Sequence, residues 1–233
     1  MIALHVPCLI QARRPQTLRA MRTVGDALGW EQTIPKGQTC CGLPAWEAGF
    51  EDAARDAARR TVHLFRDADV VLTPSAACHV MLTRRIPELL VDDPKAGGAQ
   101  VLARKTRMWS DYLAENGDAL APKLRFSGRA MLLDSCARGF SDAFRDFIAA
   151  IPGLTLVKSL GDCCNFSHDL SRRHPDIAAA IAESQAAVLR RRKLDVILVN
   201  EPGCQLQLDP FCQTKPGAHL LHPAEFLAAM LRK

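Results

Sequence analysis

The chain has 233 residues, of which 48% are apolar and 24% charged, a composition typical of a globular protein with a sizeable core. The net charge of +5 is modest, and aromatic residues make up only 6%, which argues against a nucleic-acid-binding surface. No run approaches the roughly 20 apolar residues needed to cross a bilayer, and the opening has no basic leader. We therefore expect a cytoplasmic protein without direct membrane insertion.

Short apolar runs alternate with helical patterns in the first half of the chain. A proline at position 15 suits the first turn of a helix. The patterns predict strands over 2–6 and 69–73, and helices over 15–28, 45–67, 79–90 and 100–116.

The second half repeats this order. It predicts strands over 130–133, 154–157 and 195–199, and helices over 141–151, 175–192 and from 223 onward. The segment DVVLTPSAAC at 69–78 matches DVILVNEPGC at 195–204. Strands that alternate with helices indicate parallel sheets. We therefore predict an α/β fold of two tandem pseudo-symmetric parallel-sheet units, over 1–117 and 118–233.

Eight of the nine cysteines form two sets with the same internal order. Equivalent positions lie 128, 123 and 126 residues apart. Each cysteine lies at or after the end of a predicted strand, where loops of a parallel sheet converge. Cys212 falls outside both sets. The first set is Cys8, Cys40, Cys41 and Cys78, and the second is Cys136, Cys163, Cys164 and Cys204.

Four thiolates per set complete the ligands of one iron–sulfur cluster. A reducing cytoplasm disfavours disulfides. A single isolated cysteine is usually a small core residue, but eight cysteines placed twice in one order indicate a metal site. Zinc is the alternative, although zinc sites usually draw on CxxC pairs, which are missing here. Within the first set, Gly42 gives the adjacent pair a backbone that tolerates positive φ, and Pro44 fixes the exit of the loop.

Several polar residues lie beside the cysteines. Their charge or hydrogen bonds could tune a cluster, the two histidines could ligate it, or all of them could simply line loops and cap turns. They are His79, His168, Asp134, Asp162 and Glu201. No P-loop, GxGxxG or GxSxG motif is present, so an independent nucleotide-binding or hydrolase activity has no support.

Two segments, QTCCGLP at 38–44 and TPSAAC at 73–78, resemble the cysteine-rich "CCG" proteins. This domain occurs in one of the subunits of heterodisulfide reductase and in the iron–sulfur part of glycolate oxidase. The chain is most similar to the lactate-utilisation branch. The resemblance covers nearly the whole chain and includes PCLI at 7–10, DSC at 134–136, DCC at 162–164, PGC at 202–204 and HPAEFL at 222–227.

The departures from the family pattern are informative. The widest form of the family motif ends in a CxxC pair. Here Ser75 and Glu201 replace the first cysteine of that pair. The lactate branch also tends to lack this cysteine. In the second half, Asn165 replaces the glycine after the cysteine pair, and Ala137 replaces a histidine. The first site is therefore the stronger prediction.

The resemblance implies an iron–sulfur electron-transfer subunit of an L-lactate or 2-hydroxyacid oxidation complex, with one or two clusters of the 4Fe–4S type. Its partners would be a ferredoxin-like iron–sulfur protein and a third component. We expect loops over 43–49 and 202–212 to form the docking face, with Cys212 at its rim. The alternatives are a heterodisulfide-reductase-like redox subunit and a zinc-bound or metal-free scaffold.

Overall fold

The computed structural model describes residues 1–159, 164, 166, 168–212 and 218–231. Within this part of the chain, the strands form two four-stranded sheets in which every pairing is parallel. The first sheet contains β1 (Ile2–Leu4), β2 (Gln32–Thr33), β3 (Val70–Thr73) and β4 (Thr106–Met108). The second contains β5 (Gly128–Leu133), β6 (Leu154–Val157), β7 (Val196–Val199) and β8 (His219–Leu221).

The two sheets have the same topology. Their strand orders are β2-β1-β3-β4 and β6-β5-β7-β8. In each sheet, the strand that comes first in the chain occupies the second place, and the strand that comes third in the chain pairs with it. Ala3 pairs with Val71 in the first sheet, and Met131 pairs with Ile197 in the second. The prediction of two tandem pseudo-symmetric α/β units is confirmed.

The helices surround these sheets. In the first half they are α1 (Cys8–Arg13), α2 (Pro15–Ala27), α3 (Leu43–Glu47), α4 (Glu51–Leu64), α5 (Ala76–Val80), α6 (Ile86–Leu89), α7 (Ala96–Lys105) and α8 (Trp109–Asn116), with a π-helical turn at Met81–Arg85. A 3-10 helix at Asp118–Lys123 leads into the second half. The helices there are α9 (Asp142–Ala149), α10 (His168–Arg173), α11 (Pro175–Arg190), α12 (Pro202–Cys212) and α13 (Pro223–Leu231).

Both faces of the central strands are buried. Leu4, Leu72 and Leu198 belong to a core shared by the two halves, whereas their neighbours Val71 and Ile197 face two separate outer cores. Side chains alternate between the faces of a strand, so a continuous apolar run fits a sheet that is covered on both sides. Burial of both faces explains why the sequences of these strands are apolar runs without alternation.

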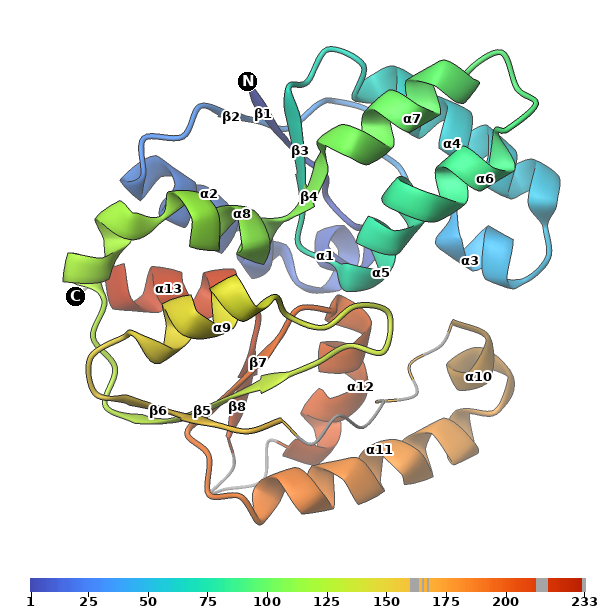
Figure 1. Ribbon diagram of the computed structural model, residues 1–233. Helices are drawn as coiled ribbons and strands as arrows, with labels where there is room; N and C mark the ends of the chain where they lie inside the picture. Colours follow the sequence, from blue (N-terminus) through green and yellow to red (C-terminus); the bar gives the residue numbers. More distant parts are fainter. Residues whose placement is uncertain (160–163, 165, 167, 213–217, 232–233) are drawn as a thin grey trace.

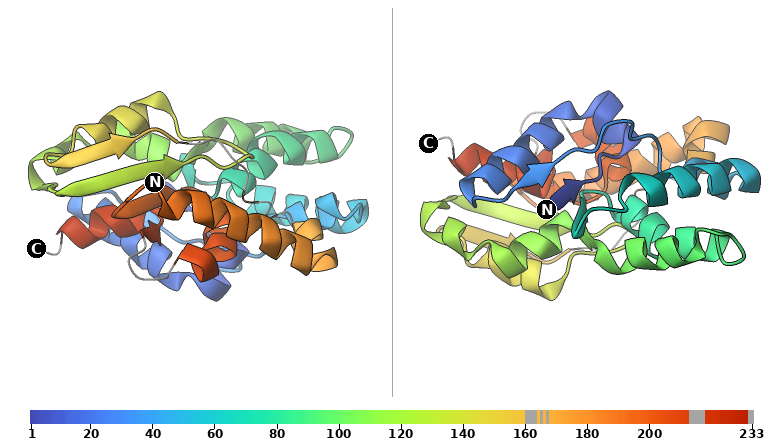
Figure 2. Two further views of the ribbon diagram at one scale, coloured as in Figure 1. Left: turned by 90° about the horizontal axis from the view of Figure 1, so that it is seen from below. Right: turned by 90° about the horizontal axis from the view of Figure 1, so that it is seen from above.

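The middle layer holds the halves together. Figure 1 shows α2, α8, α9 and α13 between the two sheets, and α13 contacts α2 while α8 contacts α9. In both views of Figure 2 the red terminal helix lies beside the blue helices of the first half. The core of each half is therefore completed by elements of the other.

Two predicted helices are interrupted in the structure. The helix predicted over 45–67 is α3 followed by α4, because Gly49 has a φ of 79° that ends α3. The helix predicted over 100–116 is α7 and α8 separated by β4, which pairs with β3. A strand of three residues is too short to establish a period in sequence, and only its distant partner stabilises it. The strands β2 and β8, with two and three residues, are equally short, and α12 occupies a segment expected to be a loop.

No helix in the described ranges is long and apolar enough to span a bilayer.

Candidate metal centre

The first set of cysteines lies beyond the carboxyl ends of the strands in the first sheet. Cys8 begins α1, soon after β1. The adjacent pair Cys40-Cys41 lies in the loop between β2 and α3. Cys78 lies in α5, which follows β3. Three separate segments thus supply the four thiols, as the spacing of the cysteines predicted.

A glutamine side chain fixes the loop that carries the adjacent pair. The Gln38 amide oxygen accepts a hydrogen bond of 2.8 Å from the Val6 backbone N–H, and its Nε2 donates one of 2.8 Å to the Leu4 carbonyl. The side chain therefore provides hydrogen-bond partners for backbone groups at the end of β1 and just after it. The only sign of this role in the sequence is the place of Gln38 just before the cysteine pair.

The backbone of the pair then turns at Gly42, as predicted. Its φ is 95°, and a Cβ at this position would lie 3.0 Å from the Cβ of Ala57 and 3.3 Å from the Ala54 carbonyl oxygen. Pro44 occupies the first turn of α3 and directs the chain away. Only glycine combines this backbone geometry with such close contact to α4.

The four thiols converge on one small cavity of about 20 Å³. The Sγ atoms of Cys8 and Cys40 are 3.8 Å apart, and those of Cys41 and Cys78 are 3.5 Å apart. The second half of the chain contributes to the wall. The lining residues are Pro7, Cys8, Leu9, Cys40, Cys41, Leu43, Pro44, Ser75, Ala77, Cys78, Glu201 and Pro202.

The closeness of the thiols controls their ionisation. A hydrogen bond with Cys40, together with burial, raises the pKa of Cys8. Hydrogen bonds with Cys40 and Cys78, followed by burial, raise the pKa of Cys41. Cys8 and Cys41 therefore keep their protons near neutral pH, and a bound metal would have to displace those protons.

A buried histidine lies beside this site. The Nδ1 atom of His5 is 3.1 Å from the Thr73 hydroxyl oxygen, and the ring is 2% exposed. Burial lowers the pKa of His5 to about 4, although the nearby Cys40 opposes the shift. The imidazole is therefore neutral near pH 7. In the sequence, His5 shows only as a polar residue in an apolar run, which indicates no role by itself.

The described members of the second set differ in burial. Cys136 is exposed in the loop after β5, whereas Cys164 and Cys204 are buried and hydrogen-bonded to each other. That bond raises the pKa of Cys204 and lowers that of Cys164. Cys163 lies outside the described residues, as do Asp162 and Asn165.

The polar residues beside the cysteines differ in role. Asp134 braces a turn, because its carboxylate accepts from the Phe140 N–H and forms an ion pair with Arg145. His79 is partly buried, and its pKa is lowered to about 4, first by burial and then by Arg138. Glu201 lines the first cavity although it belongs to the second half. The side chain of His168 lies outside the described part of the chain.

The expected docking segments are helical. The segment 43–49 contains α3, and 202–212 is α12. Cys212 is 2% exposed in the outer core of the second sheet, so the prediction that it lies at a rim is wrong. Burial raises its pKa to about 11. It packs as a small apolar residue.

Family comparison agrees with the repeated architecture. The sequence signature of the family described as "Cysteine-rich domain", abbreviated CCG, matches residues 2–83 and 130–209. These two matches cover well over half of the chain and include one cysteine set each.

The chain belongs to the cysteine-rich domain family.

The chain is also similar to proteins named for lactate utilisation. The chain is 29% identical to "Lactate utilization protein A" of Bacillus velezensis, over 97% of this chain and 98% of that protein. It is 27% identical to the protein of the same name in Bacillus cereus strain G9842, over 89% of each chain.

A solved structure supports the fold alone. A hypothetical protein from Helicobacter pylori has a TM-score of 0.62 and 10% identity. The match covers all of this chain, which spans about half (49%) of that longer chain.

Proposed function

We propose that this cysteine-rich domain protein is an iron–sulfur electron-transfer subunit of an L-lactate or related 2-hydroxyacid oxidation complex. The observation that carries the proposal is the convergence of Cys8, Cys40, Cys41 and Cys78 on one cavity. The names of the lactate-utilisation relatives support the choice of lactate as the substrate of the complex. The units 1–117 and 118–233 would each hold one site, and we expect the protein in the cytoplasm.

The residues present fit a cluster by the chemistry of the donor set. Four thiols line the cavity, and thiolates are the usual ligands of iron–sulfur clusters. Zinc also accepts four thiolates, but it brings no inorganic sulfide with it. The sulfide content of the protein therefore distinguishes a cluster from zinc.

When bound, a cluster would accept and pass single electrons. The chain's own residues hold it and set its environment. Gln38 and Gly42 fix the loop of Cys40 and Cys41. Neutral His5 adds a buried polar group beside Cys40 without adding charge. A buried, weakly polar site favours the less charged state of a cluster, which changes its potential.

The second set would bind less securely. Cys136 is exposed, whereas Cys164 and Cys204 are buried and hydrogen-bonded to each other. The sequence departures at Asn165 and Ala137 directly follow Cys164 and Cys136 in the chain. We therefore expect the first site to bind its cluster more securely than the second, with one or two 4Fe–4S clusters per chain.

The metal content of the anaerobically purified protein tests this proposal. We expect iron and acid-labile sulfide, an electron paramagnetic resonance signal after reduction, and visible absorbance. The variant Cys41→Ser removes one thiolate of the first set and should lose about half or more of the iron.

The matched control is Cys212→Ala, which removes a buried cysteine outside both sets. It should keep the full iron content. Zinc without sulfide would support the scaffold instead, and cleavage of a disulfide substrate by the isolated chain would support the heterodisulfide-reductase-like alternative. Equal iron content in Cys41→Ser and the parent protein would refute the ligand assignment.

A further inference from the structure

The two halves meet through equivalent residues beside their cysteines. Ser75 lies three residues before Cys78, and Glu201 lies three residues before Cys204. The Ser75 hydroxyl donates a hydrogen bond of 2.7 Å to a Glu201 carboxylate oxygen. Both side chains are buried, with 1% and 8% exposure. The internal symmetry therefore brings these two positions into direct contact.

The same carboxylate caps two helices. Its Oε2 also accepts 2.9 Å from the Ala77 N–H in the first turn of α5, and its Oε1 accepts 3.1 Å from the Gly203 N–H in the first turn of α12. The first amide groups of a helix have no partner within the helix, and an acidic side chain there is favoured by the helix dipole. α5 carries Cys78, and α12 carries Cys204.

The short helix α5 depends on the other half of the chain. The Ala76 N–H donates 3.0 Å to the Asn200 carbonyl, and the Cys78 N–H donates 3.1 Å to the Ser75 hydroxyl, which is itself held by Glu201. The segment 200–201 thus satisfies two amides of α5 directly and positions the group that satisfies a third. A helix of five residues has little stability of its own, so these contacts determine where Cys78 lies.

The charge of Glu201 reaches both cysteine sites. Its side chain lines the cavity of the first set. Its other carboxylate oxygen accepts from the Gly203 N–H, one residue before Cys204 of the second set. One carboxylate therefore contributes to the electrostatics of two places that the sequence separates by more than a hundred residues.

We propose that Glu201 is a positioning residue shared by the two cysteine sites. Through one carboxylate it holds the first turns of α5 and α12, and with them Cys78 and Cys204. It also gives both sites a common negative charge. The part of this inference that concerns cluster potentials rests on the proposed iron–sulfur function, whereas the part that concerns the thiols does not.

The first test uses the metal-free protein. Each thiol is alkylated with iodoacetamide, and the rate at each cysteine is measured by peptide mass spectrometry. In Glu201→Ala, Cys78 and Cys204 should react roughly three- to tenfold faster, the scale expected when a helix cap is lost. Ser75→Ala should accelerate Cys78 more than Cys204. The control Glu183→Gln changes an exposed glutamate of α11 and should leave both rates unchanged.

The second test uses the variant Glu201→Gln, which carries no charge and keeps one acceptor oxygen, so it can still accept from the first turn of either α5 or α12. It should keep its metal content, and the reduction potentials of the signals from both sites should rise together, because a nearby negative charge opposes the arrival of an electron. A residue with a purely structural role would not move the potentials of a fully loaded protein.

These outcomes separate the two proposals. Faster alkylation at Cys78 and Cys204 in a protein that never binds iron would support the shared role of Glu201 and refute the proposed function. Unchanged alkylation of Cys78 in both Glu201→Ala and Ser75→Ala would overturn the shared role. A change at Cys204 alone would also overturn it, because Glu201 would then serve only its own half.

Discussion

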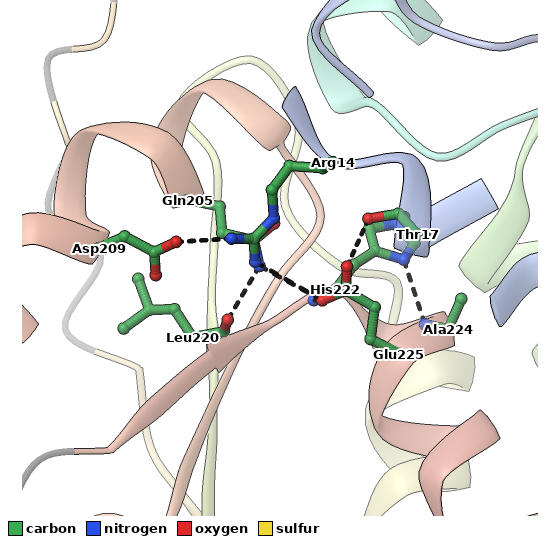
Figure 3. A network of polar contacts seen from close by, with 8 residues as sticks. All are labelled: Arg14, Thr17, Gln205, Asp209, Leu220, His222, Ala224 and Glu225. Carbon is green, nitrogen blue, oxygen red and sulfur yellow. Dashed lines mark hydrogen bonds and ion pairs between the residues drawn. The ribbon is translucent and has the colours of Figure 1, made fainter. Parts of the chain in front are cut away.

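The variant Arg14→Ala should destabilise the protein by breaking a buried network between the halves. Arg14 lies between α1 and α2, and its guanidinium is 2.7 Å from Asp209 of α12 and 3.7 Å from Glu225 of α13 (Figure 3). The Glu225 carboxylate also accepts from Thr17, at 2.6 Å. The three charged side chains are 9–16% exposed.

The size of the effect follows from this burial. Loss of one partner from a buried ion pair costs about 3–5 kcal/mol, and the residual exposure here places the expected loss near 3 kcal/mol. For a chain of this size, that corresponds to a fall in Tm of about 6–12 °C. The matched control is Arg13→Ala, an exposed neighbour in the last turn of α1, which should change the stability by less than about 0.5 kcal/mol.

The dependence on pH gives a second criterion. Burial raises the pKa of Asp209 even though Arg14 opposes the shift. Without Arg14 this pKa should rise further, so the folded state binds a proton more tightly than the unfolded state. The deficit of Arg14→Ala should therefore be small at acid pH and grow as the pH rises through the raised pKa.

Urea denaturation followed by circular dichroism measures both quantities. Adding Asp209→Asn and Glu225→Gln to Arg14→Ala should restore part of the lost stability, because the uncompensated charges are removed. A free energy of unfolding for Arg14→Ala within about 0.5 kcal/mol of the parent protein at pH 8 would refute the reasoning.

Three further predictions concern the site and the shared core. Gly42→Ala should lower the iron content of the protein and its Tm, because position 42 has a positive φ and the new Cβ contacts Ala57. Gly29→Ala also lies at a positive φ but has nothing within 4 Å, so it measures the backbone cost alone. Equal effects of the two variants would contradict the packing argument. Burial lowers the pKa of His222 to about 4, so this side chain is neutral in the folded state near pH 7. The free energy of unfolding should therefore fall as the pH drops from about 6.5 toward 4. In urea titrations at several pH values, His222→Gln should show a smaller fall. Lactate-dependent dye reduction should require the partner subunits, and robust turnover by the isolated chain would show that the catalytic centre lies within it.

The sequence determined much of the local structure. Apolar runs predicted most of the longer strands, because both faces of those strands are buried. The shared order and similar spacing of the two cysteine sets predicted the repeat, and Cys-Cys-Gly predicted the turn at Gly42. These signals are carried by neighbouring residues, so no knowledge of distant contacts was needed.

Only the tertiary structure decided the rest. β4 and β8 exist because they pair with β3 and β7, and their three residues carry no period of their own. Cys212 is a core residue because α12 packs it against the second sheet. The sequence aligned Ser75 with Glu201 as equivalent positions, but their contact arises from the packing of one half against the other. Such contacts depend on the relative placement of elements far apart in the chain, which hydrophobic periodicity does not encode.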